Sequence, residues 1–243
     1  MSAVKADIID QLRKDMLLLQ GFKKIINPYA PEILPASVRS AFPNAQFPIG
    51  AVHEFISFHQ EEVAATAGFI SGILASLMLK SGACIWINSS KNIFPPALKL
   101  FGIPPEKIIF IHLKKEKEIL WAMEEALKCE SLTAVIGELR ELNFTASRRL
   151  QLAVEKSQVT GFILRDNPRS LNTTACVTRW KITSLPSELP NDMPGVGFPK
   201  WEVELLKVRN GKPGKWEIEF TEGRLRYNSK INAIPMISKK KTG

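Results

Sequence analysis

Short apolar runs alternate with helical patterns along the middle of the chain. Five of these runs predict strands, at Val52–Ile56, Ala83–Asn88, Ile108–Leu113, Thr133–Leu139 and Thr160–Arg165. Between them, apolar residues at helical spacing predict helices over Glu61–Lys80, Pro95–Phe101, Lys117–Lys128 and Thr145–Ser157. Strands that alternate with helices form mostly parallel sheets, because each parallel connection has to cross over the sheet.

The pattern changes in the last third of the chain. Period-two alternation predicts four further strands, at Ala175–Thr183, Trp201–Arg209, Trp216–Phe220 and Leu225–Tyr227. The Asn-Gly pair within Arg209–Gly214 predicts a hairpin turn. We therefore expect an α/β fold in which a mostly parallel sheet, flanked by helices, carries an antiparallel β extension at its C-terminal end. A ligand site would lie at the C-terminal ends of the parallel strands.

The two ends of the chain differ from this core. Ala6–Gln20 has apolar residues on one helical face. Asn27–Pro48 is rich in proline, which predicts a linker with at most a short helix near Ala36–Ala41. Residues from Ser229 onward are rich in lysine and contain no acid. The expected organisation is an N-terminal helix and linker over 1–46, a core over 47–228, and a basic, flexible tail over 229–243.

One apolar run raises the question of a membrane span. Val63–Leu79 contains no charged residue and is flanked by Glu62 and Lys80. A spanning helix needs roughly 20 apolar residues. Because this run is shorter and is diluted by Ala, Gly, Ser and Thr, we expect a helix buried beneath the sheet and no membrane span.

The cysteines suggest an intracellular protein. Cys84, Cys129 and Cys176 lie far apart and form no CxxC pair, so neither a disulfide framework nor a zinc site is indicated. We expect a cytoplasmic protein without a metal site.

The charge balance is basic. Lysine and arginine outnumber aspartate and glutamate by 33 to 24, which gives a formal net charge of +9. One acid-free stretch is the tail, and the other holds Lys207, Arg209, Lys212 and Lys215. Such stretches suit a polyanion or an acidic protein surface, although a solvated face has the same composition.

The turn after the first strand carries the most informative chemistry. "SFHQEEVA" (57–64) lies where nucleotide-binding α/β proteins have GxxxxGK[ST]. Ser57 and Glu62 stand at the glycine positions, Val63 at the lysine position and Ala64 at the hydroxyl position. Because Val63 and Ala64 supply neither the cation nor the metal-holding hydroxyl, we expect a degenerate phosphate loop.

Acidic residues in the same turn support this interpretation. Glu61 and Glu62 fall at a helix N-terminus, where the dipole that would hold a phosphate favours their own negative charge. Two acids there are also an ordinary helix stabiliser, and either interpretation predicts a poor nucleotide site. His59 is interpreted as a surface or capping residue. We therefore predict no catalytic residue and no cofactor.

Several motifs then resemble one family. "FPIGAVHEFIS" resembles the segment that leads into the phosphate loop of RecA, and "CIWINSS" and "TAVIGEL" resemble later RecA core strands. "LWAMEEALKCESLTAVIGEL", "NFTASRRLQLAVEKSQVTGFILR", "TRWKI" and "WEVELLKVRNGKPGKWEIEF" resemble the ImuA family, the RecA-like accessory proteins of damage-induced mutagenesis. The resemblance runs from about Phe47 to Phe220, most of the chain.

The resemblance implies a RecA-like, P-loop-type core without a working ATPase. Ser90 stands at the strand end where RecA has its catalytic glutamate, and only Glu138 remains as an acid on the metal side. The resemblance also implies the partners, an ImuB-type protein and an error-prone, replicative-type polymerase, in SOS-type translesion DNA synthesis. RecA itself is a further candidate partner.

Two sets of residues are candidates for contacts with partners. Basic side chains near strand ends and in the late hairpin are candidate DNA or anion contacts, with solvated surface arginine as the alternative: Arg148, Arg149, Arg165, Arg169, Arg209, Lys212 and Lys215. The tail interleaves apolar and basic residues that are candidates for partner binding, with a disordered end as the alternative: Ile234, Met236, Ile237, Lys239, Lys240 and Lys241.

Three functions therefore stay open at this stage. The first is a non-enzymatic scaffold of the translesion machinery. The second is an ATP-dependent, RecA-like recombination or repair protein with an unusual loop. The third is a regulator of the SulA type that binds RecA or a cell-division protein.

Overall fold

The computed structural model describes residues 32–79, 82–89, 93–187 and 197–227. Within these ranges the chain forms a nine-stranded sheet in the order β3-β2-β4-β5-β1-β6-β7-β8-β9. Its strands are β1 (Val52–Ser57), β2 (Ala83–Asn88), β3 (Ile108–His112), β4 (Leu132–Leu139), β5 (Thr160–Asp166), β6 (Thr178–Leu185), β7 (Lys200–Val208), β8 (Gly214–Thr221) and β9 (Arg224–Tyr227).

The sheet has a parallel part and an antiparallel part. The strands from β3 to β6 in this order pair in parallel, whereas β7, β8 and β9 each run antiparallel to the strand before. This arrangement confirms the predicted fold class. The first strand in the sequence, β1, lies in the interior between β5 and β6, so the turn that follows it opens near the middle of the carboxyl edge of the parallel strands.

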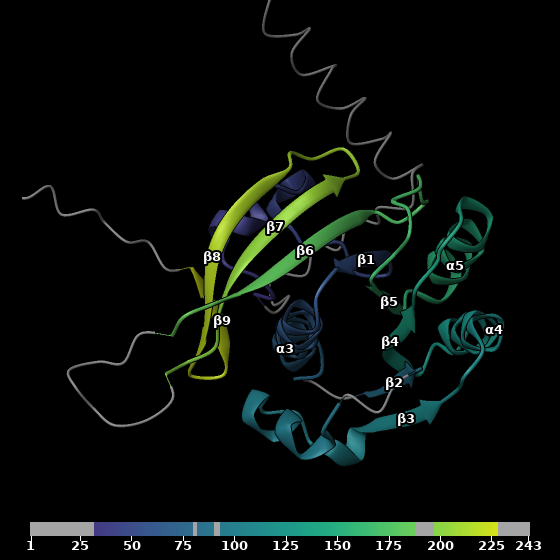
Figure 1. The fold of residues 1–243 in the computed structure, drawn as a ribbon, viewed down its shortest axis with the longest axis horizontal. Helices are drawn as coiled ribbons and strands as arrows, with labels where there is room; N and C mark the ends of the chain where they lie inside the picture. Colours follow the sequence, from purple (N-terminus) through teal and green to yellow (C-terminus); the bar gives the residue numbers. More distant parts are fainter. Residues whose placement is uncertain (1–31, 80–81, 90–92, 188–196, 228–243) are drawn as a thin grey trace, which may run out of the picture.

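Helices cover both faces of the parallel part (Figure 1). The α-helix α3 (Gln60–Leu77) lies on one face, and α4 (Glu116–Leu127) and α5 (Phe144–Ser157) lie side by side on the other. The remaining short elements are the α-helix α2 (Ala36–Arg39) and the 3₁₀ helices η1 (Pro43–Ala45), η2 (Pro95–Phe101) and η3 (Pro105–Lys107). Two prolines open η2, and Gly102 ends it with φ 76°, a value that glycine adopts without strain.

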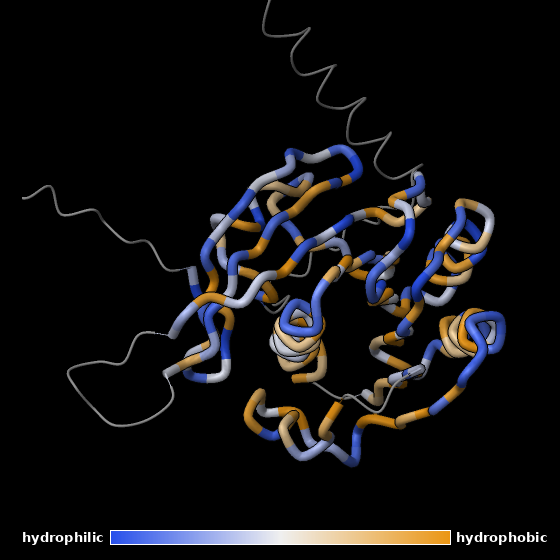
Figure 2. Tube along the Cα trace, viewed as in Figure 1, coloured by the Kyte–Doolittle hydropathy of each residue, from blue (hydrophilic) through white to orange (hydrophobic). Residues whose placement is uncertain are grey.

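The helix α3 is enclosed by the sheet. Figure 2 shows it mostly orange and white beyond its blue beginning, and Figure 1 shows β6 to β9 curling around it. A Cβ at Gly72 would lie 2.9 Å from Leu225 Cδ2, so this glycine permits the close approach of β9. The uncharged run is therefore a buried helix, as expected. Among the described residues, no helix is long and apolar enough to cross a membrane.

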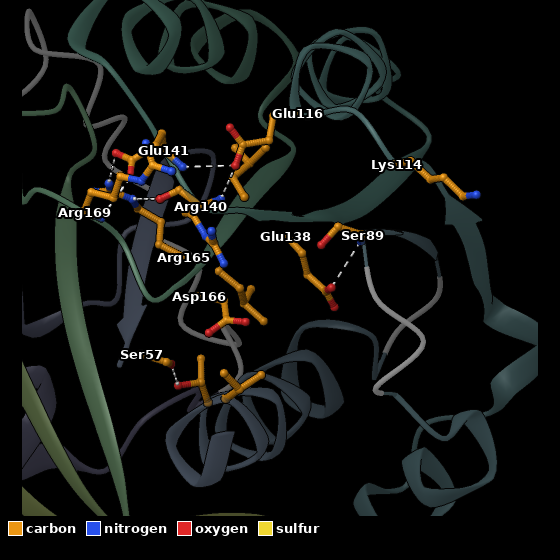
Figure 3. A pocket seen from close by; sticks show the side chains of 14 residues that line it. Ser57, Ser89, Lys114, Glu116, Glu138, Arg140, Glu141, Arg165, Asp166 and Arg169 are labelled. Carbon is orange, nitrogen blue, oxygen red and sulfur yellow. Dashed lines mark hydrogen bonds and ion pairs between the residues drawn. The ribbon is translucent and has the colours of Figure 1, made fainter. Parts of the chain in front are cut away.

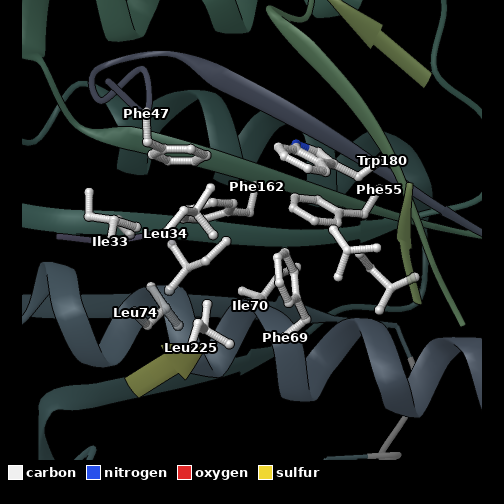
Figure 4. Packing of buried hydrophobic residues seen from close by; sticks show 14 of the residues in the cluster. Ile33, Leu34, Phe47, Phe55, Phe69, Ile70, Leu74, Phe162, Trp180 and Leu225 are labelled. Atoms are coloured by element: carbon white, nitrogen blue, oxygen red, sulfur yellow. The ribbon is translucent and has the colours of Figure 1, made fainter. Parts of the chain in front are cut away.

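The segment before β1 corrects the predicted domain organisation. Residues 32–46 were expected to be a linker, but Ile33, Leu34 and Phe42 are buried in the same cluster as Phe55 and Phe69. Figure 4 shows Ile33 and Leu34 packed beside the side chains of α3. The core therefore begins before residue 47, because these apolar side chains fill the face that α3 leaves open.

A buried histidine connects this segment to the sheet. His53 stacks on Phe47 at 4.5 Å between ring centroids, and its Nε2 lies 2.8 Å from Pro48 O. Its Nδ1 lies 2.8 Å from Thr178 Oγ1, which accepts a bond of 2.7 Å from Trp180 Nε1. These bonds fit a neutral imidazole that donates through Nε2. Burial lowers the pKa of His53 from 6.5 to about 4, against the opposing effect of the bond to Pro48.

Several predictions from the sequence lie outside the described residues. They are the N-terminal helix over Ala6–Gln20, Ser90, and the basic tail with its candidate partner-binding residues. The predicted helices and strands within the described ranges are all present, with bounds that differ by a few residues.

Candidate functional site at the carboxyl edge of the sheet

The turn between β1 and α3 lies where a phosphate loop would lie. Ser57 ends β1, and its Oγ is 3.1 Å from Thr66 Oγ1 on α3. Val63 lies beside a cavity at this edge, whereas Glu61 and Ala64 are exposed. His59 occupies the N-cap position of α3, but its side chain makes no capping hydrogen bond.

Glu62 fills the turn with its own carboxylate. Phe58 N donates to Glu62 Oε2 at 2.7 Å, and Lys181 Nζ on β6 lies 3.2 Å from Glu62 Oε1. Burial raises the pKa of Glu62, but the hydrogen bond from Phe58 and the charge of Lys181 outweigh it, so the pKa is lowered overall. An ionised carboxylate therefore accepts the backbone hydrogen bond that a phosphate in this turn would otherwise accept.

The loops after β2 and β4 are held in the same way. Glu138, at the end of β4, accepts from Ser89 N at 3.3 Å and from Trp86 Nε1 at 3.2 Å. Glu116, in the first turn of α4, accepts from the consecutive amides of Arg140 at 2.7 Å and Glu141 at 3.3 Å. Consecutive amides that converge on one acceptor form an anion-binding nest, which here holds a side chain of the same chain.

The loop after β5 completes the set. Arg169 N donates to Glu141 Oε1 at 2.8 Å. Backbone amides after β1, β2, β4 and β5 are thus each capped by a carboxylate, from Glu62, Glu138, Glu116 and Glu141 respectively. We refer to these four positions as the capped loops.

A cavity of about 450 Å³ lies between the capped loops. Figure 3 shows the side chains around it, with Ser57 on one side, Glu138 and Ser89 on another, and Arg165, Arg169 and Glu141 together on a third. Among the described residues, no group of three histidine, cysteine or acidic side chains could hold a metal ion. The cavity is therefore lined by both charge signs. Glu116, Glu138 and Glu141 accept hydrogen bonds from backbone donors, and Asp166 is a fourth carboxylate in the lining.

A buried ion-pair network lies behind the cavity. Glu54, on β1, accepts from Arg165 Nη1 at 2.8 Å, from Arg179 Nε at 2.8 Å and from Thr174 Oγ1 at 2.9 Å. The side chain of Glu54 is fully buried, and so is that of Arg165. The reasoning from the sequence missed this network. The signal was present, because a glutamate inside an apolar strand requires a buried cation or donor.

Arg165 is therefore not a DNA contact, and that prediction was wrong. The residue is 1% exposed. Its Nε donates to Arg140 O at 3.1 Å, in addition to the ion pair with Glu54. A guanidinium enclosed in this way cannot reach a phosphate of a bound strand.

The segment after β5 is fixed by basic side chains that donate to its carbonyl oxygens. Arg165 donates to Ser170 O at 3.0 Å, and Arg179 donates to Asn172 O at 2.6 Å. Two further donors, at 2.8 Å each, are Lys207 to Thr174 O and Arg209 to Ala175 O. Burial lowers the pKa of Lys207 and of Arg209. These bonds connect four carbonyl oxygens of residues 170–175 to basic side chains from other parts of the chain.

The other basic candidates are distributed over several elements. On α5, Arg148 Nη1 lies 3.9 Å from Glu155 and Arg149 Nη2 lies 2.6 Å from Glu124. In the late hairpin, Lys215 pairs with Glu202 at 2.8 Å, while the backbone of Lys212 donates to Ala41 O. Arg169 is exposed beside the cavity. The structure thus brings Arg169 to the site, and gives Arg148, Arg149 and Lys215 acidic partners elsewhere.

The strand order and the position of the capped loops define a RecA-like α/β protein. No family model matches the chain. The KaiC-like protein PH0186 from Pyrococcus horikoshii OT3 has a similar fold, with a TM-score of 0.52 at 11% identity, over 82% of this chain and 97% of that one. This likeness concerns the fold alone.

Comparison with curated proteins identifies the family. Protein ImuA of Caulobacter vibrioides (strain NA1000 / CB15N) is 33% identical over 198 residues, which are 76% of this chain and 81% of that protein. The chain belongs to the ImuA family. It is also similar to the cell division inhibitor SulA of Photorhabdus laumondii, with 31% identity over 114 residues, 45% of this chain and 64% of that protein.

Proposed function

We propose that this chain is a non-catalytic accessory protein of SOS-type, error-prone translesion DNA synthesis. It acts with an ImuB-type protein and an error-prone, replicative-type polymerase. Membership of the ImuA family supports the general role in damage-induced mutagenesis. The single observation that supports a non-catalytic role is the set of capped loops at the carboxyl edge of the sheet.

The capped loops oppose a nucleotide by competition. A phosphate would have to replace Glu62 at Phe58 N and Glu116 at the amides of Arg140 and Glu141. Hydrogen bonds to charged groups contribute about 1.5–3 kcal/mol each. The displaced carboxylates would remain close to the phosphate, and like charges at short range repel. Each capped loop therefore adds a cost to nucleotide binding.

The side chains that would favour a phosphate are replaced as well. Val63 stands at the lysine position and Ala64 at the hydroxyl position. The turn therefore supplies neither a cation for a phosphate nor a hydroxyl ligand for a magnesium ion. Lys181 is a cation beside the turn, and it is paired with Glu62. These replacements and the capped loops act in the same direction.

Calorimetric titration with ATP and magnesium tests the non-catalytic role. We expect no heat of binding and no hydrolysis. We also expect no turnover from the quadruple variant Ser57→Gly, Glu62→Gly, Val63→Lys, Ala64→Thr, because Glu138 and Glu116 still cap the other loops. A low-micromolar ATP site in the unchanged chain, lost in Glu138→Ala, would establish the alternative, an ATP-dependent repair protein.

A pull-down with purified components tests the partners. The full chain should retain an ImuB-type protein, and a chain that ends at Asn228 should retain less, because the removed tail interleaves Ile234, Met236 and Ile237 with lysine. The matched control is a full-length chain in which Ile234, Met236 and Ile237 are changed to serine. It keeps the lysines of the tail, so it separates the loss of apolar side chains from the loss of positive charge. Equal capture by the shortened chain would assign the contact to the core.

The similarity to SulA supports a second candidate function, a regulator that binds RecA or a cell-division protein. This role predicts that expression of the chain without DNA damage causes filamentous growth. It also predicts co-sedimentation with purified RecA or with the division protein. Normal cell length together with retention of the ImuB-type protein would favour the accessory role.

A further inference from the structure

The layer formed by α4 and α5 carries a large aromatic side chain at its surface. Trp121, on α4, is 64% exposed. Figure 1 shows α4 and α5 side by side, with no described helix or strand on the side away from the sheet. Tryptophan is among the residue types that contribute most at protein interfaces. An exposed indole on an open pair of helices therefore points to a contact that a single chain does not make.

A second cavity, of about 420 Å³, opens between the same two helices near their C-terminal ends. Leu152, which is 49% exposed, and Ala153 give it an apolar side. The rest of the lining is polar and consists of Glu124, Lys128, Glu130, Arg149, Lys156 and Ser157. This cavity shares no lining residue with the one between the capped loops. We refer to it as the helix cavity.

The helix cavity suits an indole ring. Its apolar side offers hydrophobic contact. Arg149 and Lys128 supply cations, which are attracted to the face of an aromatic ring, and to that of tryptophan most strongly. A buried indole N–H needs an acceptor, and the carboxylates of Glu124 and Glu130 lie in the same lining. Each part of a tryptophan side chain therefore has a matching group.

We propose that the chain forms a two-fold symmetric dimer in which the α4 helices of the two copies lie antiparallel, and Trp121 of each copy occupies the helix cavity of the other. Trp121 and Lys128 are about two turns apart, roughly 10 Å along the axis of α4. A two-fold axis midway between them places the indole of one copy at the cavity of the other. Both contacts form together, because a two-fold interface uses the same patch of both copies.

Two unpaired charges fit the same axis. In the part of the chain that the structure describes, the side chains of Lys117 and Glu130 have no ion pair or hydrogen bond. They lie toward opposite ends of α4, and the point midway between them nearly coincides with the point midway between Trp121 and Lys128. The axis that seats the indole therefore also brings Lys117 of one copy to Glu130 of the other. A second copy thus supplies both the aromatic side chain and the complementary charge.

The remaining charges favour an antiparallel arrangement of the two α4 helices over a parallel one. Glu116 is directed to the amides of Arg140 and Glu141, so the outward charges at the beginning of α4 are mostly basic: Lys114, Lys115, Lys117 and Glu118. Around the helix cavity the two signs balance: Lys128, Arg149, Lys156, Glu124, Glu125 and Glu130. A parallel arrangement would bring two basic ends together. The antiparallel one places each basic end beside a balanced end, where the negative ends of two helix dipoles also lie.

Sedimentation equilibrium on the full chain tests the proposal. We expect a monomer–dimer equilibrium at micromolar concentration, and Trp121→Gln should weaken dimerisation at least tenfold. Leu100→Gln, at a side chain on η2 that is 80% exposed, is the matched control and should leave dimerisation unchanged. Urea denaturation should show both variants folded, because each replaces an exposed side chain. A chain that stays monomeric at millimolar concentration, or a dimer that Trp121→Gln does not weaken, would overturn the proposal.

Charge reversal tests the two-fold geometry. Lys117→Glu and Glu130→Lys should each weaken dimerisation at least threefold, because each variant places like charges at both contacts of its dimer. The mixed dimer of the two variants should form as readily as the dimer of the unchanged chain, because one contact is then reversed and the other is unchanged. Sedimentation with one variant labelled measures this recovery. A mixture that associates no better than the separate variants would contradict the antiparallel arrangement.

Fluorescence quenching distinguishes a seated indole from contact between the helices alone. As the dimer forms, iodide should quench Trp121 less, and the difference between the unchanged chain and Trp121→Gln isolates this signal. Leu152→Gln should weaken dimerisation at least fivefold, because it removes the apolar side of the helix cavity. A dimer in which Trp121 stays as accessible to iodide as in the monomer would refute the exchange of indoles. These results do not depend on a role in translesion synthesis.

Discussion

His53 and Glu54 are adjacent on β1 and both are fully buried, yet their polar groups have different kinds of partner. His53 stays neutral and lies in a chain of hydrogen bonds with Pro48, Thr178 and Trp180. Glu54 accepts hydrogen bonds from Arg165, Arg179 and Thr174, two of them in ion pairs.

The difference follows from the neighbours that each residue has on its own face of the sheet. Successive side chains of a strand point to opposite faces. His53 belongs to the aromatic face, where it stacks on Phe47 and Phe162, and a charge there would lack a partner. Glu54 lies beside the segment after β5, and its arginines also hold the carbonyls of that segment. Neutral His53 therefore stabilises the aromatic packing, whereas the ion pairs of Glu54 order the segment after β5 at the candidate site.

Removal of the Glu54 carboxylate should have the largest effect. Glu54→Ala removes the closer and fully buried carboxylate partner of Arg165 and leaves it only the longer contact with Glu141, at 3.4 Å. The loss of a buried ion pair costs about 3–5 kcal/mol. Urea denaturation measures it. The double variant Glu54→Leu, Arg165→Met should be more stable than Glu54→Ala, because it leaves no orphaned charge at that pair. A double variant that is less stable than either single variant would mean that the network contributes more than charge compensation.

The loss of stability at low pH should test the neutral, buried His53. The pKa of His53 is about 4 in the folded protein and 6.5 in the unfolded chain, so the unfolded chain binds the proton first as pH falls. The contribution of neutral His53 to the free energy of unfolding is complete above about pH 6.5. It decreases toward pH 4, where the loss of unfolding free energy reaches about 3 kcal/mol. Stability measured at several pH values should show a smaller decrease over this range in His53→Gln. Equal decreases in the two proteins would contradict a neutral, buried His53.

A carboxylate at the rim should matter less for stability than Glu54. Glu62→Gln keeps a neutral acceptor for Phe58 N but loses the ion pair with Lys181, so we expect a loss of about 1–2 kcal/mol. Because the pKa of Glu62 is lowered, this contribution is present above the usual carboxyl range and decreases as pH falls. Glu61→Gln, at the exposed neighbour, is the matched control. It removes one charge from the first turn of α3 without breaking a hydrogen bond or ion pair, so its loss of stability should be smaller than that of Glu62→Gln.

The smallest effect on stability should come from an exposed pair on α5. Arg149→Ala breaks the contact with Glu124 and should change stability by less than about 0.5 kcal/mol. If Arg149 contacts DNA, the same variant should reduce the slope of log affinity against log salt for a labelled single strand by about 0.7. Fluorescence anisotropy measures the slope. An unchanged slope would remove Arg149 from the candidate DNA contacts.

The capped loops show how far residue identities alone lead. The replacement of lysine and hydroxyl by Val63 and Ala64 can be read from the turn, since each side chain has one chemistry wherever it lies. The partners of Glu116 and Glu141 could not be read in this way. Both glutamates are far along the chain from the amides or loops that they hold, and only the order of the strands brings them together.

The sequence by itself determined the alternation of strands and helices, the antiparallel end and the helix formed by the uncharged run after Glu62, because each depends on local periodicity and composition. The tertiary structure alone decided that residues 32–46 belong to the core, that Arg165 is buried, and that β3 is an edge strand of the described sheet. These outcomes depend on contacts between segments far apart in the chain. The turn after β1 combines both, since its missing lysine is local, whereas the charge that Glu62 presents there is fixed by Lys181 on a distant strand.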